Sequence, residues 1–89
     1  MAIYIITYDL REPGQHYDSL IERIKNYGNW AKLGYSCFLI ETDDTAVEIR
    51  DNLSKALDGN DKLYVGVANA PAAWTGLPEN VSQWIKEKL

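Results

Sequence analysis

The order of the apolar patterns along this chain constrains its fold more than any other feature of the sequence. Runs rich in β-branched and aromatic residues, which favour strands, alternate with stretches whose apolar residues recur at helical spacing. The strand-like runs cover residues 2–9, 29–33, 35–42 and 62–68, and the helical stretches begin at Tyr17 and Thr45. This β-α-β-β-α-β order is the ferredoxin-like one. It predicts an α+β fold in which two helices pack on one face of a four-stranded antiparallel sheet.

Short local signals support the boundaries of these elements. Gly28 follows the first helical stretch, and glycine commonly occupies the position just past a helix end. Gly34 separates the second and third strand-like runs and predicts a bend or a bulge there. Thr45 and Glu48 have the spacing of a capping box, which predicts that the second helix starts at this point.

A third helix is predicted close to the C-terminus. It begins at Leu77-Pro78, because proline is well tolerated in a first helical turn. Val81, Trp84 and Ile85 recur at helical spacing and are expected to point inward.

The chain is predicted to form one domain over residues 1–89, since no linker, internal repeat or low-complexity tract divides it. Residues 2–69 form the expected ferredoxin-like core, and residues 70–89 form a helical extension. Tryptophans supply bulk in so small a chain, and three of them are expected to anchor the packing of this extension: Trp30, Trp74 and Trp84.

Charge and composition limit the classes of function that suit the chain. Its 89 residues carry nine Lys and Arg against thirteen Asp and Glu, which gives a net charge of −4. A protein that holds nucleic acid by charge usually has a basic surplus, so strong nonspecific binding is not expected. No signal peptide and no membrane-spanning stretch is expected either. The single cysteine suits a reducing compartment, and we expect the protein in the cytoplasm.

Two strand-like runs end in carboxylates. Asp43 and Asp44 precede a predicted helix, where an acid stabilises the positive end of the helix dipole, so these two are expected to cap that helix. Asp9 ends the first run, and no helix follows it immediately. Asp9 is therefore the candidate functional carboxylate, either as a metal ligand or as a solvated acid at a strand end.

Several short motifs follow one another along the chain. They are TYDL at residues 7–10, NYG at residues 26–28, YSCFLIE at residues 35–41 and DKLYVGVA at residues 61–68. In this order and spacing they resemble the CRISPR-associated protein two family, whose relatives include VapD-type ribonucleases and small SinR-like proteins. The resemblance covers about residues 3–68.

The resemblance implies a ferredoxin-like homodimer that cleaves phosphodiester bonds in RNA or DNA. Carried over by position, the family's aspartate is Asp9, and two copies near the dimer axis would hold Mg²⁺ or Mn²⁺. Tyr8 would flank this metal, and Ser36 and Phe38 would lie on the neighbouring strand. Such a cation activates water and neutralises the charge that develops on the phosphate.

Other polar residues near the end of the first run are secondary candidates. His16, the only histidine, is predicted at the same end of the sheet as Asp9, either as a general acid or base or as polar surface. Arg11 is a candidate binding residue in a region where many members of the family carry several basic side chains. Cys37 is expected to be a small core residue, because nothing in the sequence marks an activated thiolate.

Aromatic residues are frequent on the predicted strands: Tyr4, Tyr8, Tyr35, Phe38 and Tyr64. On a sheet face that the helices leave open, they would form either a hydrophobic dimer interface or a surface on which bases stack. The basic-glycine-aromatic signature of RNA-binding sheets is absent, which favours the interface.

A noncatalytic function is the second hypothesis. The acidic charge, the few basic residues and the aromatic strands also fit a protein that binds another protein or a nucleotide-like ligand. A role in defence, counter-defence or a toxin–antitoxin pair would suit such a protein, and the fold also serves as a ligand-sensing module.

Overall fold

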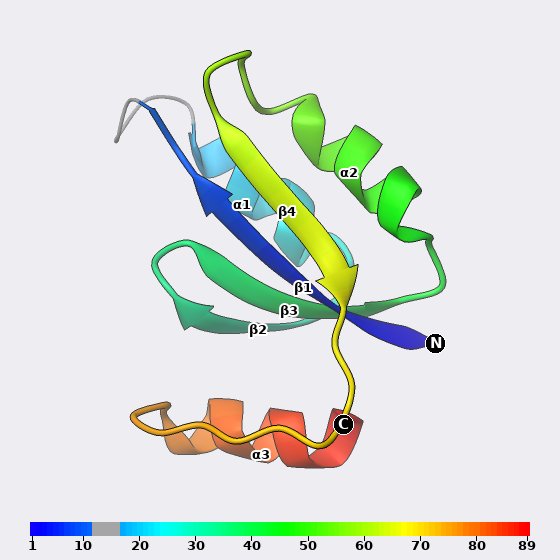
Figure 1. Cartoon of the computed structure of the whole chain (residues 1–89), viewed down its shortest axis with the longest axis vertical. Coiled ribbons are helices and arrows are strands. Elements are labelled where there is room, and N and C mark those ends of the chain that lie inside the picture. The colour runs from blue at the N-terminus through cyan, green and yellow to red at the C-terminus, as the bar shows by residue number, and fades with distance from the viewer. Residues whose placement is uncertain (12–16) are drawn as a thin grey trace.

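The computed structural model describes residues 1–11 and 17–89 and has a small α+β fold (Figure 1). Its elements are β1 (Ala2–Asp9), α1 (Tyr17–Lys25), β2 (Asn29–Gly34), β3 (Cys37–Thr42), α2 (Ala46–Ser54), β4 (Lys62–Val67) and α3 (Glu79–Lys88). The strands form one antiparallel sheet in the order β2-β3-β1-β4. The predicted four-stranded antiparallel sheet and the C-terminal helix are confirmed, and the arrangement is consistent with a ferredoxin-like fold.

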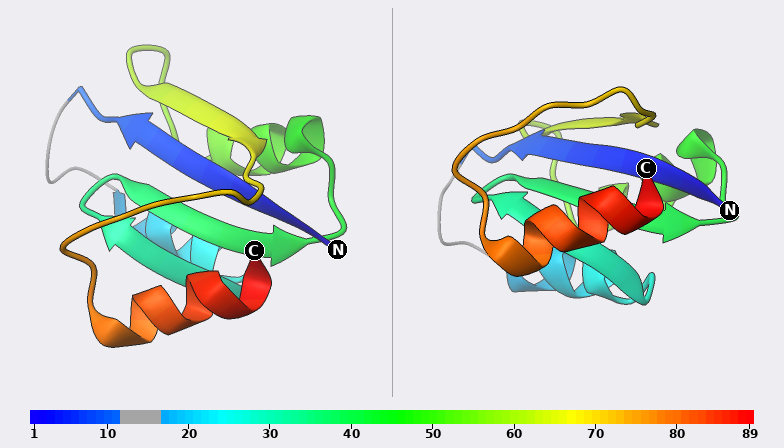
Figure 2. Two further views of the ribbon diagram at one scale, coloured as in Figure 1. Left: turned by 60° about the horizontal axis from the view of Figure 1, so that its bottom comes forward. Right: turned by 90° about the horizontal axis from the view of Figure 1, so that it is seen from below.

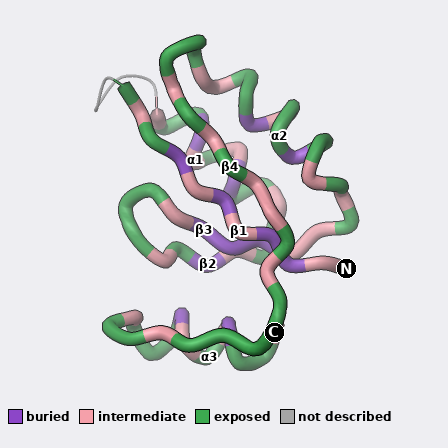
Figure 3. The backbone as a smooth tube through the Cα atoms, viewed as in Figure 1, coloured by how far each residue is buried: buried purple, intermediate pink, exposed green. Residues whose placement is uncertain are grey.

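The sheet separates two apolar clusters, one on each face. α1 and α2 cover one face, and α3 with the segment before it lies across part of the other (Figure 2). Because successive strand residues point to opposite faces, Ile6 of β1 packs toward α1 and α2 whereas Ile3 packs toward α3. From Tyr4 to Tyr8, buried and less buried residues alternate along β1, and the buried residues of the helices gather on their inner sides (Figure 3).

The larger cluster lies between the sheet and the first two helices. Its fully buried members include Ile6, Leu20, Ile24, Phe38, Ile40, Ile49 and Leu53. The smaller cluster on the opposite face joins three strands to α3 and consists of Ile3, Ala31, Leu39, Val81 and Ile85. Together the two clusters sandwich β1 and β3, which are the central strands of the sheet.

The prediction that the aromatic residues line an open face of the sheet was wrong. Tyr4, Tyr8 and Phe38 are buried in the larger cluster, on the side of α1 and α2. Tyr35 lies in the turn between β2 and β3 and is 94% exposed. Tyr64 is the one that projects from a strand toward the opposite face, since it pairs with Thr7 of β1. Strand-like composition does not reveal which residues share a face, because the register decides this.

The three tryptophans do not all anchor the C-terminal extension. Trp74 and Trp84 do pack in the α3 cluster, and the indole Nε1 of Trp74 donates to Ser82 Oγ at 2.9 Å. Trp30 instead lies on the other face of the sheet, where its ring meets Phe38 edge-on at a centroid distance of 6.0 Å. The prediction for Trp30 was therefore wrong, because its position in β2 points it toward α1.

The capping box, the glycine after α1 and the bulge are confirmed, whereas the expectation that Asp43 and Asp44 cap α2 is wrong, because Thr45 is its N-cap. Thr45 is the N-cap of α2, and both hydrogen bonds of its capping box with Glu48 are present. Gly28 has φ of +92°, the left-handed conformation that favours glycine after a helix. The pairing of β2 with β3 shifts register between Lys32 and Gly34, where the bulge was predicted.

Candidate functional site

Asp9 lies at the end of β1, a central strand, and its side chain is exposed. The register of β1 with β4 places Asp9 directly opposite Lys62, the first residue of β4. Residues that pair across two antiparallel strands point to the same face, so this carboxylate and this ammonium group project together. Among the described residues no ion pair joins Asp9 to another side chain.

A small pocket lies beside these two residues and has a volume of about 160 Å³. Thr7 and Asp9 of β1, and Lys62 and Tyr64 of β4, line it with side chains from the same face of the sheet. Tyr8 and Leu63 complete the lining. We call these six residues the Asp9 pocket. α3 packs over the other end of this face, around Ile3 and Leu39, and so leaves the pocket uncovered.

Asp61 fixes the backbone around the Asp9 pocket. Its Oδ1 accepts a hydrogen bond from the backbone N–H of Arg11 at 2.9 Å, and its Oδ2 accepts one from the N–H of Asp58 at 3.1 Å. The carboxylate therefore ties the chain just past Asp9 to the loop that leads into β4. The side chain of Arg11 is exposed, so it is free to meet an anion near the pocket.

Tyr8 has a structural role in this site. Its hydroxyl donates to the carbonyl oxygen of Tyr35 at 3.1 Å, and its backbone N–H donates to the carbonyl oxygen of Ser36 at 3.1 Å. Both bonds hold the end of β1 against the turn between β2 and β3. Ser36 lies in that turn, ahead of β3, and is exposed.

Phe38 does not reach the site as a binding residue. Its side chain is fully buried between the sheet and the first two helices, on the face away from the Asp9 pocket. Cys37, its neighbour in β3, pairs with Thr7 and so points to the pocket's face, where it is half-buried. His16 lies outside the residues that the structure describes, and its expected place beside Asp9 stays a prediction.

Three weakly acidic side chains, one thiol and two phenols, have pKa values above their usual ones. Burial raises the pKa of the Cys37 thiol, of the Tyr27 hydroxyl and of the Tyr8 hydroxyl, the last also through the charge of Cys37. The folded protein thus holds these protons more tightly than the unfolded chain does. Their contribution to stability is complete below the unfolded pKa values and is lost as the pH rises through the folded ones.

We therefore expect the midpoint of urea unfolding to stay constant between about pH 7 and 8 and to fall above about pH 9, where thiols and then phenols titrate. Equilibrium urea titrations followed by far-UV circular dichroism test this. Cys37→Ser should remove the first part of the fall and leave the part that belongs to the tyrosines. A midpoint that rises with pH in this range would contradict the assignment.

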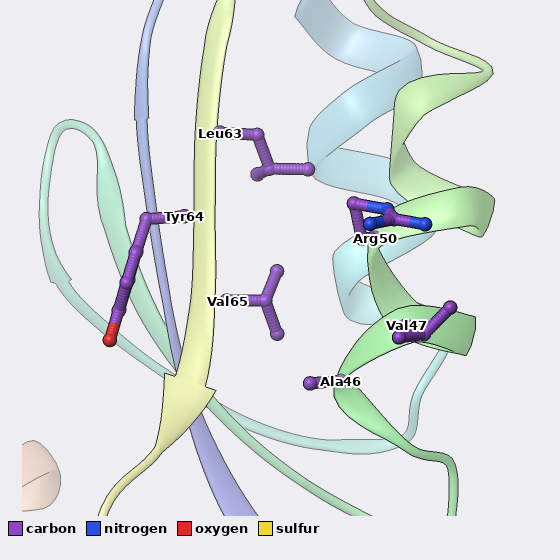
Figure 4. Close-up of a pocket in the computed structure, with 6 residues that line it drawn as sticks. All are labelled: Ala46, Val47, Arg50, Leu63, Tyr64 and Val65. Carbon is purple, nitrogen blue, oxygen red and sulfur yellow. The ribbon is translucent and has the colours of Figure 1, made fainter.

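A second hollow, of about 230 Å³, lies between α2 and β4. Leu63 and Val65 point into it from β4 and Ala46 points toward them from α2, while Val47 and Arg50 complete the lining on the side of α2 (Figure 4). Tyr64 adds its backbone and turns its ring to the other side of the strand. We call this the β4 groove. It is apolar except for Arg50, which pairs with Asp51 at 2.9 Å.

Sequence reasoning found Asp9 but missed Lys62, Thr7 and Asp61. In the linear sequence nothing distinguishes these three polar residues from others. Only the pairing of β1 with β4 brings them close to the Asp9 carboxylate. For Asp61, the run of turn-forming residues just before a predicted strand was the available signal.

Comparison with known proteins supports the fold. No protein-family model matches the chain. A crystal structure of a hypothetical protein, TT1823 from Thermus thermophilus, superimposes with a TM-score of 0.70 at 23% sequence identity, over 85% of this chain and 92% of that one. At this identity the likeness concerns the fold alone.

In residues 1–11 and 17–89, no three His, Cys, Asp or Glu side chains gather closely enough to hold a metal ion by themselves. Within the same ranges, none of the helices combines the length and the apolar character that crossing a bilayer requires.

Proposed function

We propose that this chain is a small cytoplasmic homodimer of the ferredoxin-like class that binds Mg²⁺ or Mn²⁺ and hydrolyses phosphodiester bonds of RNA or DNA at the Asp9 pocket. The observation that best supports the proposal is the pairing of Asp9 with Lys62 on adjacent strands beside an uncovered pocket. A carboxylate binds a hard cation and an ammonium group binds a phosphate, so together they match a metal-bound phosphodiester.

The donor set of the pocket fits a cation that arrives with its substrate. Magnesium usually keeps several waters and binds through one or two carboxylates together with substrate phosphates. Asp9 offers one such carboxylate, and the phosphate supplies further oxygens. The cation, when bound, supplies charge neutralisation and a more acidic water.

The protein's own groups would then orient the substrate. Lys62 is a flexible point charge that pairs with a phosphate oxygen. The hydroxyl of Thr7, from the same face, can donate a hydrogen bond to a further phosphate or sugar oxygen. The Tyr64 hydroxyl lies over Gly66 of its own strand, so Tyr64 contributes only the side of its ring to the lining. Arg11 supplies a second exposed cation just beyond Asp9. Asp61 is a positioning residue, because it holds the backbone of Arg11 without facing the substrate itself.

The test is cleavage of labelled single-stranded RNA and DNA by the purified protein with Mg²⁺ or Mn²⁺. We expect Asp9→Asn to lower cleavage by more than about a hundredfold, which exceeds the usual loss from an outer-shell partner of a metal. Asp43→Asn is the matched control, since Asp43 is an exposed acid that directly follows another strand, β3. Equal activity in wild type and Asp9→Asn, at equal folding by circular dichroism, would refute the proposal.

A second candidate function, noncatalytic binding of a protein, rests on a different observation. The β4 groove is apolar and open beside a strand that has a neighbour on one side only. If the purified protein neither cuts nor binds RNA or DNA at low salt, this second function replaces the first.

A further inference from the structure

β4 is an edge strand whose outer side has no partner among the described residues. It pairs with β1 on one side only. The backbone N–H of Ala68 donates to the carbonyl oxygen of Ile3 at 2.9 Å. In an antiparallel pair such bonds alternate, so the even-numbered residues of β4 bond to β1. The backbone groups of Leu63, Val65 and Val67 therefore point away from the sheet, ready to pair with another strand.

The two edges of the sheet differ in how they are protected. β2, the opposite edge, has a register shift after Lys32, and bulges and lysines are devices that discourage edge-to-edge pairing. β4 has neither device beyond its first residue: from Leu63 to Val67 it is uncharged, contains no proline and pairs with β1 without a shift. An edge of this kind is a template for an added strand.

We propose that β4 pairs with β4 of a second copy of this chain, antiparallel and centred on Val65, so that two sheets join into one continuous sheet. This inference does not rest on the phosphodiesterase proposal. The other occupants of such an edge, a strand of a different protein or none, are outcomes of the test below.

The sequence of β4 is complementary to itself in this register. On the side of α2, Val65 meets its own copy and Leu63 meets the partner's Val67, so that every pair is apolar. On the other side, Tyr64 lies opposite the partner's Gly66, and Lys62 lies opposite the partner's Ala68. No charge faces a like charge in these pairs. Within each copy the Tyr64 ring already lies over Gly66 of its own strand.

The β4 groove provides the space that this pairing needs. Residues that pair across antiparallel strands point to the same face, so the partner's valines would enter the hollow between β4 and α2. Val47 of α2 and Val67 of β4 are 54% and 56% exposed in the single chain. Pairing would remove apolar surface of both from water, which favours association.

The register also places the two Asp9 pockets apart. Asp9 pairs with Lys62, three residues from Val65, and antiparallel pairing sends the partner's Lys62 the same distance in the other direction. At about 3.3 Å per residue, the two pockets are separated by roughly 20 Å along the strands. Each Asp9 pocket would therefore have to work alone, in contrast to a metal shared between two copies of Asp9 at the dimer axis.

Sedimentation equilibrium of the wild-type protein and two edge variants tests the interface. Val65→Pro removes an N–H that points outward and so spares the pairing with β1, whereas Val67→Lys adds a charge at a position that is already exposed. We expect a wild-type dimer and, in each variant, a dissociation constant raised about tenfold or more. Tyr35→Lys, an exposed aromatic at a distant turn, is the matched control and should dimerise like wild type.

Cysteine cross-linking separates the two arrangements of the dimer. In a Cys37→Ser background, Val65→Cys should form an intermolecular disulfide readily, because paired residues of this type have Cα atoms about 5.5 Å apart, within disulfide range. Asp9→Cys should not. A monomeric wild type, a dimer unaffected by both edge variants, or cross-linking through position 9 instead of 65 would each overturn the inference. None of these readouts depends on nuclease activity.

Discussion

Phe38→Ala is expected to lower the free energy of unfolding by about 3–5 kcal/mol, the usual cost of replacing a buried phenylalanine in a core. Phe38 is fully buried at the centre of the larger cluster and contacts the edge of the Trp30 ring. Alanine would leave a cavity that rigid neighbours from two strands and two helices cannot fill. An 89-residue domain has a total stability of only about 4–13 kcal/mol, so the variant should be close to unfolding at 37 °C.

Equilibrium unfolding in urea measures this loss. Tyr35→Ala is the control, because it also removes an aromatic ring from the same hairpin but from a side chain that is 94% exposed. We expect a change within about 0.5 kcal/mol for this control. A loss for Phe38→Ala no larger than that of the control would contradict the packing described above. It would also reopen Phe38 as a residue that binds a ligand.

Ile85→Asp is expected to release α3 from the sheet, at a cost of at least about 3 kcal/mol. Ile85 is buried against Ile3 and Leu39 in the smaller cluster, and a carboxylate there would lose its hydration without gaining a partner. The ion pair of Lys88 with Glu41, at 3.1 Å, would be lost together with the docked helix. The apolar face of β1 and β3 would then be exposed to solvent.

Hydrogen exchange and binding of the dye ANS report this change separately from global unfolding. Amides of α3 should exchange rapidly in Ile85→Asp while the amides that bond β1 to β3 stay protected, and ANS fluorescence should rise. Gln83→Asp is the matched control, since Gln83 lies on the exposed side of the same helix. Slow exchange of α3 in Ile85→Asp would show that the smaller cluster does not hold the helix.

Much of the fold followed from local chemistry. The strand-like run ending at Asp9, the capping box of Thr45 and Glu48, the glycine at position 28 and the bulge before Gly34 all act within a few residues, and the structure confirms each of them. The candidate site was predicted only in part. Asp9 stood out because no helix follows it, but nothing near it in the sequence pointed to Lys62, which is distant along the chain and becomes its neighbour only through pairing.

The sequence by itself therefore determined the kinds of elements, their order and their ends, because hydrophobic periodicity and capping depend on near neighbours in the chain. Only the tertiary structure decided which side chains share a face, so that Phe38 and Trp30 turned out to be core residues on the side of α1. It also decided that α3 covers one end of the opposite face and leaves Asp9, Lys62 and the outer edge of β4 open. These outcomes depend on strand register and on the docking of a helix, which are contacts between residues far apart in the chain.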